Sequence, residues 1–466
     1  TYEGTLDIGL ALQSEKGVEQ DAVWPASGVW VDMFDTKRRV KSLTSVAQMP
    51  VILGVRKSKA EALGWVGKPV YMKDILAAVK NGSLKFLMTS ATQSNSGASA
   101  YLAMLSSALG NKPVIEPGDL DKPDVQGAVR ALLGGVERSS GSSGWLADLY
   151  TDSAGKGVLY DAMWNYEAIL KETNDKLTGM SKEPLYAIYP ADGVVVADSP
   201  IGFVDHGRGQ EVETFFNQLV DYLRSAAVQK RIADTGRRIP LSDIAAKPDP
   251  AWNFDPTRIV TAIRMPEPAM IRQALDLYQV ALRKPSLTAL CLDFSGSMGG
   301  KGEEQLQAAM RFLFNPDETG KVLAQWTPAD RIMVIPFDAN VRTTYEGTGN
   351  PAQQKLLVDR VSRQRAGGGT DMYACASRAL DWMKKTGDLS SYLPAIVIMT
   401  DGKSDDANGD FMSRWASVSP HVPVFGITFG DADKRQLDAL AQETSARVFD
   451  GRGDLVSAFR AVRGYN

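Results

Sequence analysis

Two patterns of apolar and polar residues alternate along the chain: short apolar runs that are typical of strands, and longer stretches with the period of a helix. Longer stretches, of which 212–234 is the clearest, have apolar residues at every third or fourth position, the spacing of an amphipathic helix. Strand-like runs that alternate with such helices are typical of α/β domains with largely parallel sheets, which we predict for the whole chain. The strand-like runs are PVILGV (50–55), SLKFLM (83–88), LYAIYP (185–190), RIMVIPF (331–337), AIVIMT (395–400) and VPVFGITF (422–429).

Three segments interrupt this alternation. SSGSSG at 139–144 has the composition of a flexible loop or hinge. Residues 241–285 are Pro-rich (KPDPAWNFDP, RMPEPAM) and read as a linker that ends in a connecting helix, MIRQALDLYQVALRK. The start, TYEGTLDI, lacks the charged and apolar regions of a signal peptide and resembles the middle of a strand-rich unit, so we expect residues upstream of it.

Length and composition exclude several classes of protein. A chain of 466 residues is too long for one compact core, so two or three domains are expected. No apolar run approaches the roughly 18 residues needed to cross a bilayer. The net charge of −3 argues against nucleic-acid binding, and His206 and His421 are too few for a His-rich metal site or a His-based triad. Cys291 and Cys375 could pair, but we favour two free, buried, small apolar side chains.

Oxygen-bearing side chains follow two apolar runs and a glycine run in the last part of the chain. The three segments are LTALCLDFSGSM (287–298), AGGGTDMYACASRAL (366–380) and AIVIMTDGKSDD (395–406). Ligands bind at the carboxyl ends of the strands in open α/β sheets, so these side chains are expected to converge on one point. The candidate metal ligands are Asp293, Ser295, Ser297, Thr370 and Asp401.

This set of residues suits a hard cation. Carboxylate and hydroxyl oxygens bind Mg²⁺, Mn²⁺ or Ca²⁺ rather than zinc or copper, and the neutral hydroxyls leave the ion incompletely neutralised. An open coordination position would then accept an Asp or Glu of a partner protein. The alternative is a set of strand-end turns and helix caps, with Thr370 as an N-cap. Asp371, Asp405 and Asp406 are expected to be solvated or outer carboxylates rather than direct ligands.

The same residues resemble the metal-ion-dependent adhesion site of von Willebrand factor type A (VWA) domains. In that site a DxSxS motif, a Thr and an Asp cooperate, and the GGGTD and TDG contexts of this chain are also typical of the family. The resemblance covers 286–466 and continues to the closing helix, DLVSAFRAVRG. It implies a doubly wound, Rossmann-like domain that holds a divalent metal.

Small hydroxyl residues also occur at two strand-to-helix turns of the first half. Ser27 lies in WPASGVW, and Ser94, Asn95, Ser96 and Gly97 open a helix after a strand in TSATQSNSGASAYLAML. The N-terminus of a helix offers backbone N–H groups to an anion or a polar ligand. Plain N-capping explains the same residues.

The order of motifs in the first half resembles the two-lobed bacterial extracellular solute-binding proteins, in the group related to the molybdate and sulfate binders. The resemblance covers 1–240 and rests on WPASGVW, QSNSGASAYL, DAMWNYEAIL, LYAIYPADGVVVADSPIGFVD and VQKRIADTGRRIP. It implies one lobe built from the start and about 195–240, and a second from about 80–190, with the family's first strand and helix upstream. Tyr166 would join the five residues above in the cleft, although Tyr166 and Glu167 also fit ordinary core and surface positions of a helix.

Together these patterns predict a non-enzymatic, extracytoplasmic binding protein, periplasmic or on the cell surface and anchored to a membrane through upstream sequence. Its VWA domain would bind an acidic side chain of a partner protein through the metal, and a small solute could occupy the first module. One alternative is a VWA subunit of an AAA+ ATPase in a chelatase-like system, although no P-loop motif occurs in the chain. Another is solute capture for an ABC transporter. Enzymatic activity is not expected, because GxSxG, CxxC and HExxH motifs are absent.

Overall fold

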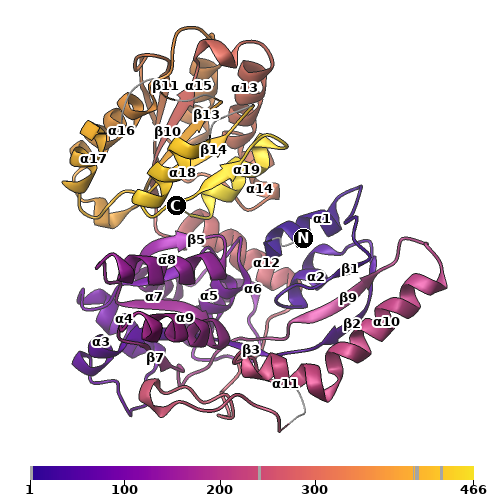
Figure 1. Cartoon of the computed structure of the whole chain (residues 1–466). Coiled ribbons are helices and arrows are strands. Elements are labelled where there is room, and N and C mark those ends of the chain that lie inside the picture. Colours follow the sequence, from indigo (N-terminus) through magenta and orange to yellow (C-terminus); the bar gives the residue numbers. More distant parts are fainter. Residues whose placement is uncertain (1–3, 240–242, 402–403, 405–408, 431–433, 466) are drawn as a thin grey trace. The chain divides into compact units, whose positions relative to one another are not determined.

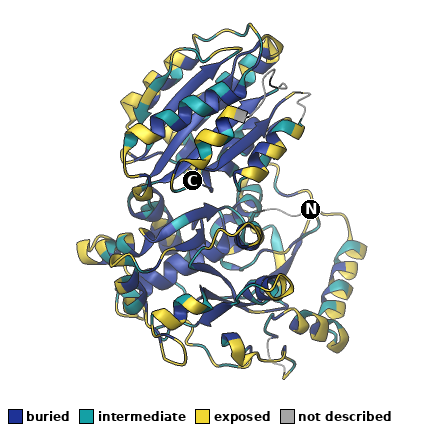
Figure 2. Cartoon of the chain, turned by 60° about the vertical axis from the view of Figure 1, so that its left-hand side comes forward, coloured by how far each residue is buried: buried dark blue, intermediate teal, exposed yellow. Residues whose placement is uncertain are grey.

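The chain forms two compact units in the computed structural model, Thr1–Tyr278 and Gln279–Asn466 (Figure 1). The structure describes residues 4–239, 243–401, 404, 409–430 and 434–465. Both units are α/β, and in each the central strands are buried, whereas β2 and β12 and the outer faces of the helices are partly or fully exposed (Figure 2). None of the described helices combines the length and apolar character needed to cross a bilayer.

The larger sheet of the first unit is mixed. Its strand order is β5-β4-β6-β3-β7, in which β4 is parallel to β5 and β6, whereas β3 is antiparallel to β6 and β7. The prediction of a largely parallel sheet is therefore wrong for this unit. The reason is that β3 enters directly from a second sheet and not through a helical crossover, so the rule for βαβ units does not set its direction. The strands are β3 (Met49–Arg56), β4 (Phe86–Thr89), β5 (Val136–Ser140), β6 (Ala162–Tyr166) and β7 (Leu185–Ile188), with β8 (Val196–Ala197) paired to β3.

The smaller sheet of this unit is antiparallel, in the order β1-β9-β2. One apolar core lies between this sheet and helices α1 and α2, and another lies between the sheet and α10. The chain passes between the two sheets twice, from β2 to β3 and from β8 to β9. The strands are β1 (Ala22–Val23), β2 (Val40–Ser45) and β9 (Pro200–Val204), and the helices are α1 (Thr5–Gln13), α2 (Val29–Phe34), α10 (Gln210–Arg224) and α11 (Ala226–Asp234).

The chain is helical from Thr5 onwards, which corrects the strand-rich interpretation of the described part of TYEGTLDI. Helix α1 buries Leu6, Gly9 and Leu12, a spacing of three, even though its apolar residues also alternate as they would in a strand. Gly9 allows a close approach to the ring of Phe34, because a Cβ at Gly9 would lie 2.8 Å from it. Packing against α2 therefore selects the helix.

Two other local interpretations need correction. The stretch 212–234 is two helices, because Ser225 adopts an extended conformation (φ −63°, ψ 146°) between α10 and α11. The SSGSSG segment is not a flexible loop: its first two residues end strand β5, and the hydroxyl of Ser142 caps helix α8 (Ser143–Gly155) by accepting from the N–H of Trp145. Small polar residues serve strand ends and caps as readily as linkers.

The Pro-rich segment packs against the first unit. Trp252 and Phe254 are buried and stacked on each other, and Ala262 forms a bridge with Val194. Helix α12 (Pro268–Leu277) then contacts α2. The remaining helices of this unit are α3 (Lys57–Ala62), α4 (Met72–Lys80), α5 (Asn95–Ala108), α6 (Pro117–Leu120), α7 (Pro123–Leu133) and α9 (Glu167–Gly179).

The second unit is built on a six-stranded sheet in the order β12-β11-β10-β13-β14-β15, in which only β12 is antiparallel to its neighbour. Helix α16 packs on one face, and α13 and α19 lie towards the other (Figure 1). The strands are β10 (Ser286–Asp293), β11 (Arg331–Phe337), β12 (Tyr345–Thr348), β13 (Leu393–Thr400), β14 (Val424–Thr428) and β15 (Val448–Asp450). The helices are α13 (Lys301–Leu313), α14 (Pro316–Lys321), α15 (Pro351–Val361), α16 (Met372–Thr386), α17 (Gly409–Ala416), α18 (Lys434–Glu443) and α19 (Leu455–Arg463).

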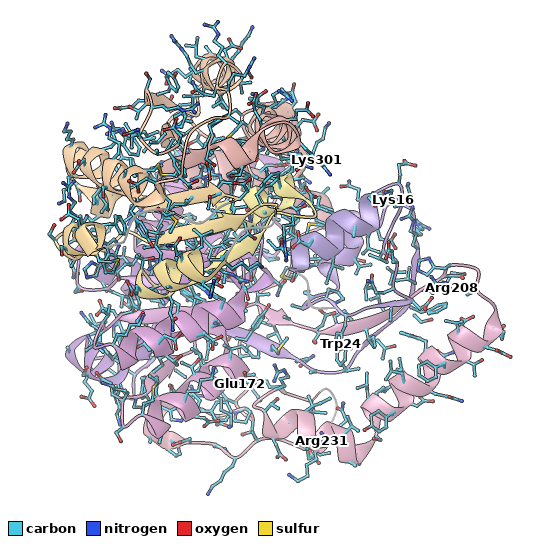
Figure 3. All side chains as sticks on the ribbon, turned by 45° about the horizontal axis from the view of Figure 1, so that its top comes forward. Lys16, Trp24, Glu172, Arg208, Arg231 and Lys301 are labelled. Atoms are coloured by element: carbon cyan, nitrogen blue, oxygen red, sulfur yellow. A yellow bond between two sulfur atoms is a disulfide. The ribbon has the colours of Figure 1, made fainter. Side chains whose placement is uncertain are left out.

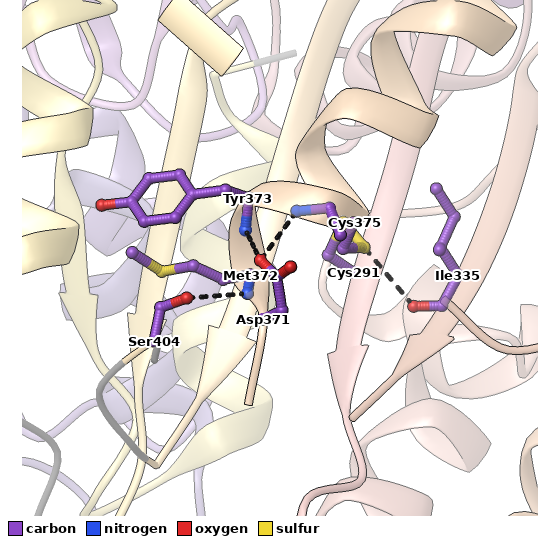
Figure 4. The surroundings of a disulfide bond; sticks show 8 residues. Cys291, Ile335, Asp371, Met372, Tyr373, Cys375 and Ser404 are labelled. Atoms are coloured by element: carbon purple, nitrogen blue, oxygen red, sulfur yellow. Dashed lines mark hydrogen bonds between the residues drawn. A yellow bond between two sulfur atoms is a disulfide. The ribbon is translucent and has the colours of Figure 1, made fainter. Parts of the chain in front are cut away.

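A disulfide joins Cys291 of β10 to Cys375 of α16, with 6.0 Å between their Cα atoms (Figure 4). The interpretation of the cysteines as two free, buried side chains is therefore wrong, although both are fully buried. Leu287, Ala289 and Cys291 point to the face of the sheet that α16 covers, and this alternation brings the two sulfur atoms together.

A buried ionic cluster lies at the other end of β10. The carboxylate of Asp330 accepts hydrogen bonds from Arg283 and from the N–H and hydroxyl of Ser286, and Arg463 lies 3.8 Å away. All four residues are buried or nearly so. Burial alone would raise the pKa of Asp330, but the two guanidinium groups lower it to about 2.

We expect this cluster to make the second unit sensitive to acid. The folded pKa of Asp330 lies below its ordinary value of 3.8, so its contribution is complete above that value and is lost as the pH falls towards about 2. The shift corresponds to roughly 2 kcal/mol of the free energy of unfolding. The protection factors of amides in β10 and β11, which correct for the slower intrinsic exchange at low pH, should fall over this pH range. Asp330→Asn should be less stable at neutral pH and should lack this step, and an equal loss of protection in both proteins would contradict the assignment.

Candidate functional site

Four of the predicted metal ligands form a hydrogen-bonded chain at the carboxyl ends of β10 and β13. The carboxylate of Asp293 accepts from the N–H of Ser295 (2.7 Å) and from the hydroxyl of Thr400 (2.5 Å). The hydroxyls of Ser295 and Ser297 are 3.1 Å apart, and Ser297 donates to Asp401 (2.7 Å). Because β10 and β13 are parallel neighbours, their last residues bring these oxygen atoms to one edge of the sheet.

The loop that carries Thr370 is tied to this edge through its backbone. Gly296 donates its N–H to the carbonyl of Gly368 (2.9 Å). Gly368 has a φ of +88°, a conformation that favours glycine. Asp371, not Thr370, caps α16, by accepting from the N–H groups of Tyr373 and Ala374 (Figure 4). Asp405 and Asp406 lie outside the described residues.

The electrostatics of this edge suit a divalent cation. Burial raises the pKa of Asp293, and the charge of Asp401 adds to the rise, whereas hydrogen bonds from Thr400 and Ser295 oppose it. An uncompensated buried carboxylate is costly, and a bound cation would offset that cost. The oxygen donors at this edge are all carboxylate or hydroxyl oxygens, as Mg²⁺, Mn²⁺ and Ca²⁺ prefer. Within the described part of the chain no three His, Cys, Asp or Glu side chains gather in a group that could hold a metal ion.

Sequence analysis missed Arg342, which braces the loops around this edge. Its guanidinium donates to the carbonyl of Phe294 (3.1 Å) in the loop after β10 and to the carbonyl of Gly367 (3.2 Å) in the Thr370 loop. A third bond reaches the carboxylate of Asp338 (2.9 Å), whose own carbonyl accepts from the N–H of Asp371. No local motif marks Arg342, because the two loop carbonyls that it binds are distant in sequence.

Replacing Arg342 by Gln should weaken metal binding by about 10–100-fold, the usual effect of removing a group that orients metal ligands. Arg342→Lys should recover only part of the affinity, since an ammonium cannot reproduce the forked geometry. Calorimetric titration with MgCl₂ or MnCl₂ measures the metal affinity of both variants. Arg311→Gln, at an exposed position of α13, is the matched control. Equal affinities in Arg342→Gln and wild type would show that the bracing does not matter.

In the first unit five of the six predicted ligand residues, 94–97 and Tyr166, lie close together and are buried. The indole of Trp30 in α2 donates to the amide oxygen of Asn95 (2.8 Å), and the amide nitrogen of Asn95 donates to the hydroxyl of Tyr166 (3.0 Å). These contacts join α2, beside the smaller sheet, to the start of α5, beside the larger one. Ser27 is partly exposed and lies at the turn before Trp30, whose N–H donates to its carbonyl.

A cluster of hydroxyl groups extends from the same helix start. Ser94 and Ser96 contact Ser143 at 3.3 and 2.7 Å, and Ser96 also contacts Thr89 at 2.7 Å. Ser143 opens α8, so the N-termini of α5 and α8 meet at this cluster. Sequence analysis missed Trp30, Thr89 and Ser143. Ser143 belongs to the second Ser-Ser pair of SSGSSG. This pair could have indicated a helix start, but the segment was interpreted as a flexible loop.

Gly97 has a structural role. A Cβ at this position would lie 2.2 Å from the backbone oxygen of Thr89, so only glycine lets α5 approach β4 this closely. Glu167 is also not a surface residue: it is fully buried, and its carboxylate accepts two bonds from Arg238 (2.7 and 2.9 Å). Arg238 follows α11, so this ion pair joins the smaller-sheet side of the unit to α9.

Sequence comparisons match both parts of the chain to known families. Residues 2–238, about half of the chain, match the family described as bacterial extracellular solute-binding protein. Residues 288–403 match the von Willebrand factor type A domain. Both families typically comprise non-catalytic binding domains. No curated protein matches the sequence.

Solved structures resemble one part of the chain or the other. A von Willebrand factor type A protein from Catenulispora acidiphila is 19% identical, with 40% of this chain and 43% of that chain covered and a TM-score of 0.32. Proximal thread matrix protein 1 of the mussel byssus, with zinc in its MIDAS motif, is 15% identical over 38% of this chain and 47% of that one (TM-score 0.30). The periplasmic binding protein AfuA from Actinobacillus pleuropneumoniae, with fructose-6-phosphate bound, is 13% identical over 53% and 77% (TM-score 0.38). The alignment thus spans less than half the length of the first two of these proteins.

Proposed function

The chain belongs to the bacterial extracellular solute-binding protein family through residues 2–238 and carries a von Willebrand factor type A domain, and from this premise we propose that it is an extracytoplasmic binding protein without enzymatic activity. Its VWA domain holds a divalent metal, Mg²⁺ or else Mn²⁺ or Ca²⁺. The ligands are Asp293, Ser295, Ser297, Thr370 and Asp401. The metal then binds an Asp or Glu side chain of a partner protein.

One observation carries this proposal: the hydrogen-bonded chain from Asp293 through Ser295 and Ser297 to Asp401 at the end of the parallel sheet. Two carboxylates only just neutralise a divalent ion, and hydroxyls add no charge. The ion therefore remains attractive to one further anionic oxygen. When bound, the metal supplies an electrophilic centre, and the chain's own residues orient it and leave one position accessible to a partner.

The test uses the full chain and pairs of synthetic peptides that differ only in Asp against Asn or Glu against Gln. Surface plasmon resonance with MgCl₂ should show binding of an acidic peptide and not of its amide twin. EDTA should abolish that binding and added Mg²⁺ or Mn²⁺ should restore it, with Zn²⁺ as a comparison ion. If the peptides that bind keep their affinity in EDTA, or if amide twins bind equally well, recognition uses another surface.

The first unit supports a small solute as a second ligand. The N-termini of α5 and α8 and the hydroxyls of Ser94, Ser96 and Ser143 offer hydrogen-bond donors to a polar or anionic group. The indole of Trp30 already donates to the amide oxygen of Asn95, so a solute that binds this oxygen would have to displace the indole. Solute capture for an ABC transporter is the second candidate function that this site favours.

The disulfide favours an extracytoplasmic location. Stable disulfides form in oxidising compartments and are rare in the cytosol, where a chelatase-like subunit of an AAA+ ATPase would act. We therefore rank the ATPase-partner alternative below both binding functions, and we place the protein in the periplasm or at the cell surface.

A further inference from the structure

A hollow of about 390 Å³ opens on the first unit beside helices α10 and α11, next to the ends of the strands of the smaller sheet. Trp24 and Arg231, both labelled in Figure 3, line it together with Tyr222 and Arg237. Side chains of Leu223, Val228 and Ile232 contribute apolar lining. Its volume falls within the range of sites that hold small molecules.

This hollow is separate from the buried hydroxyl cluster. Val23 belongs to the core under α1 and α2, whereas Ala22 belongs to the core under α10, so Trp24 continues the side of Ala22. The segment that leads from β8 to β9 also has one residue on the α1 and α2 side and the next on the side of the hollow. Asp198 accepts the N–H of Gly28 at the start of α2, and Ser199 accepts the indole N–H of Trp24.

The two aromatic groups of the hollow are exposed, and hydrogen bonds fix one of them. The indole N–H of Trp24 donates to the carbonyl and the hydroxyl of Ser199, both at 3.1 Å, which fixes the ring although 46% of the residue is exposed. Tyr222 in the last turn of α10 is 58% exposed. Aromatic faces that remain in contact with water provide a flat apolar surface for a ligand.

The charge of the hollow is positive. Arg231 is exposed on α11, and within the described residues it has no carboxylate partner. Arg237 donates to Glu172 (3.1 Å), so one of the two guanidinium charges is left unbalanced. A guanidinium binds a carboxylate through paired hydrogen bonds. The apolar lining disfavours a strongly hydrated dianion such as phosphate, and a monoanion with an apolar body fits better.

We propose that this hollow is a second ligand site of the first unit and takes a small aromatic carboxylate. Arg231 pairs with the carboxylate, and the ring lies against Trp24 and Tyr222 over the apolar side chains. This site is independent of the metal and of the hydroxyl cluster, so the first unit would respond to two chemically different small molecules.

The test is calorimetric titration of the full chain with 3-phenylpropionate and, as the uncharged control, with 3-phenylpropanamide. We expect the carboxylate to bind with an affinity in the millimolar range or tighter and the amide to bind at least tenfold more weakly, because a hydrogen bond to a charged group is lost. Arg231→Gln should weaken the carboxylate by about tenfold, and Trp24→Ala should weaken carboxylate and amide alike. Arg224→Gln, an exposed arginine at the end of α10 outside the hollow, should have no effect.

Ser143→Ala separates this site from the hydroxyl cluster and should leave binding of 3-phenylpropionate unchanged. Equal binding of acid and amide, an unaffected Arg231→Gln variant, or loss of binding in Ser143→Ala would each overturn the proposal. Absence of binding at the solubility limit of the probe would overturn it too. If only an acidic aromatic peptide binds, the surface is a protein interface and not a small-molecule site.

Discussion

Replacing Asp293 by Ala should reduce the affinity of the second unit for Mg²⁺ or Mn²⁺ by more than a hundredfold and abolish metal-dependent binding of partners. Asp293 is fully buried at the end of β10 and is one of two carboxylates at the site. Loss of an outer, orienting group costs about 10–100-fold in metal affinity, so loss of a direct ligand should cost more. Calorimetric titration of metal into wild type and variant measures the loss.

The Asp293→Ala variant should still fold, with a moderate loss in the free energy of unfolding. The hydroxyl of Thr400 and the N–H of Ser295 both lose an acceptor, and each buried unsatisfied donor costs about 1–3 kcal/mol. Asp293→Asn, which keeps an acceptor oxygen, should retain more stability and still bind metal poorly. Asp371→Asn is the matched control, because asparagine also caps a helix well and α16 keeps its cap. Normal metal affinity in Asp293→Asn, or an equal loss of affinity in Asp371→Asn, would show that Asp293 is not a specific metal ligand.

The second large effect is expected from the disulfide. Cys291 and Cys375 close a loop with a sequence separation of 84, and chain-entropy models assign such a loop about 4.5 kcal/mol of stabilisation. The double variant Cys291→Ala/Cys375→Ala should therefore unfold its second unit at a markedly lower denaturant concentration. Hydrogen exchange in β10 and α16 reports on this unit separately from the first.

Two controls make this result specific. A reductant should destabilise the wild type and leave the double variant unchanged. Thiol titration of the unfolded, unreduced wild type should find no free thiol, since the chain has only two cysteines. Two titratable thiols, or an unchanged unfolding midpoint in the double variant, would show that the bond does not form in solution.

The sequence alone determined features that depend on short patterns and on general rules of topology. Apolar runs predicted the strands that carry the site, because burial on both faces demands continuous apolar residues. The positions of Asp293, Ser295, Ser297 and Asp401 directly after such runs were informative, because parallel neighbours end at the same edge of a sheet. The family resemblances came from the order of these motifs.

Only the tertiary structure decided contacts between residues that are distant in the chain. Arg342 braces two loops, Trp30 reaches Asn95, and Glu167 is neutralised by Arg238, and none of these pairs has a local signature. The pairing of the two cysteines depends on which face of β10 each side chain occupies and on the helix that covers that face.

Packing also decided whether segments with a weak or ambiguous sequence pattern form a helix, a strand or a loop. The start of the chain alternates like a strand but is a helix, because it packs against Phe34 of α2. SSGSSG has a linker's composition but ends a strand and caps a helix. Local preferences amount to fractions of a kcal/mol per residue, whereas burying one large apolar side chain contributes about 1.5–3 kcal/mol, so tertiary packing prevails where the two disagree.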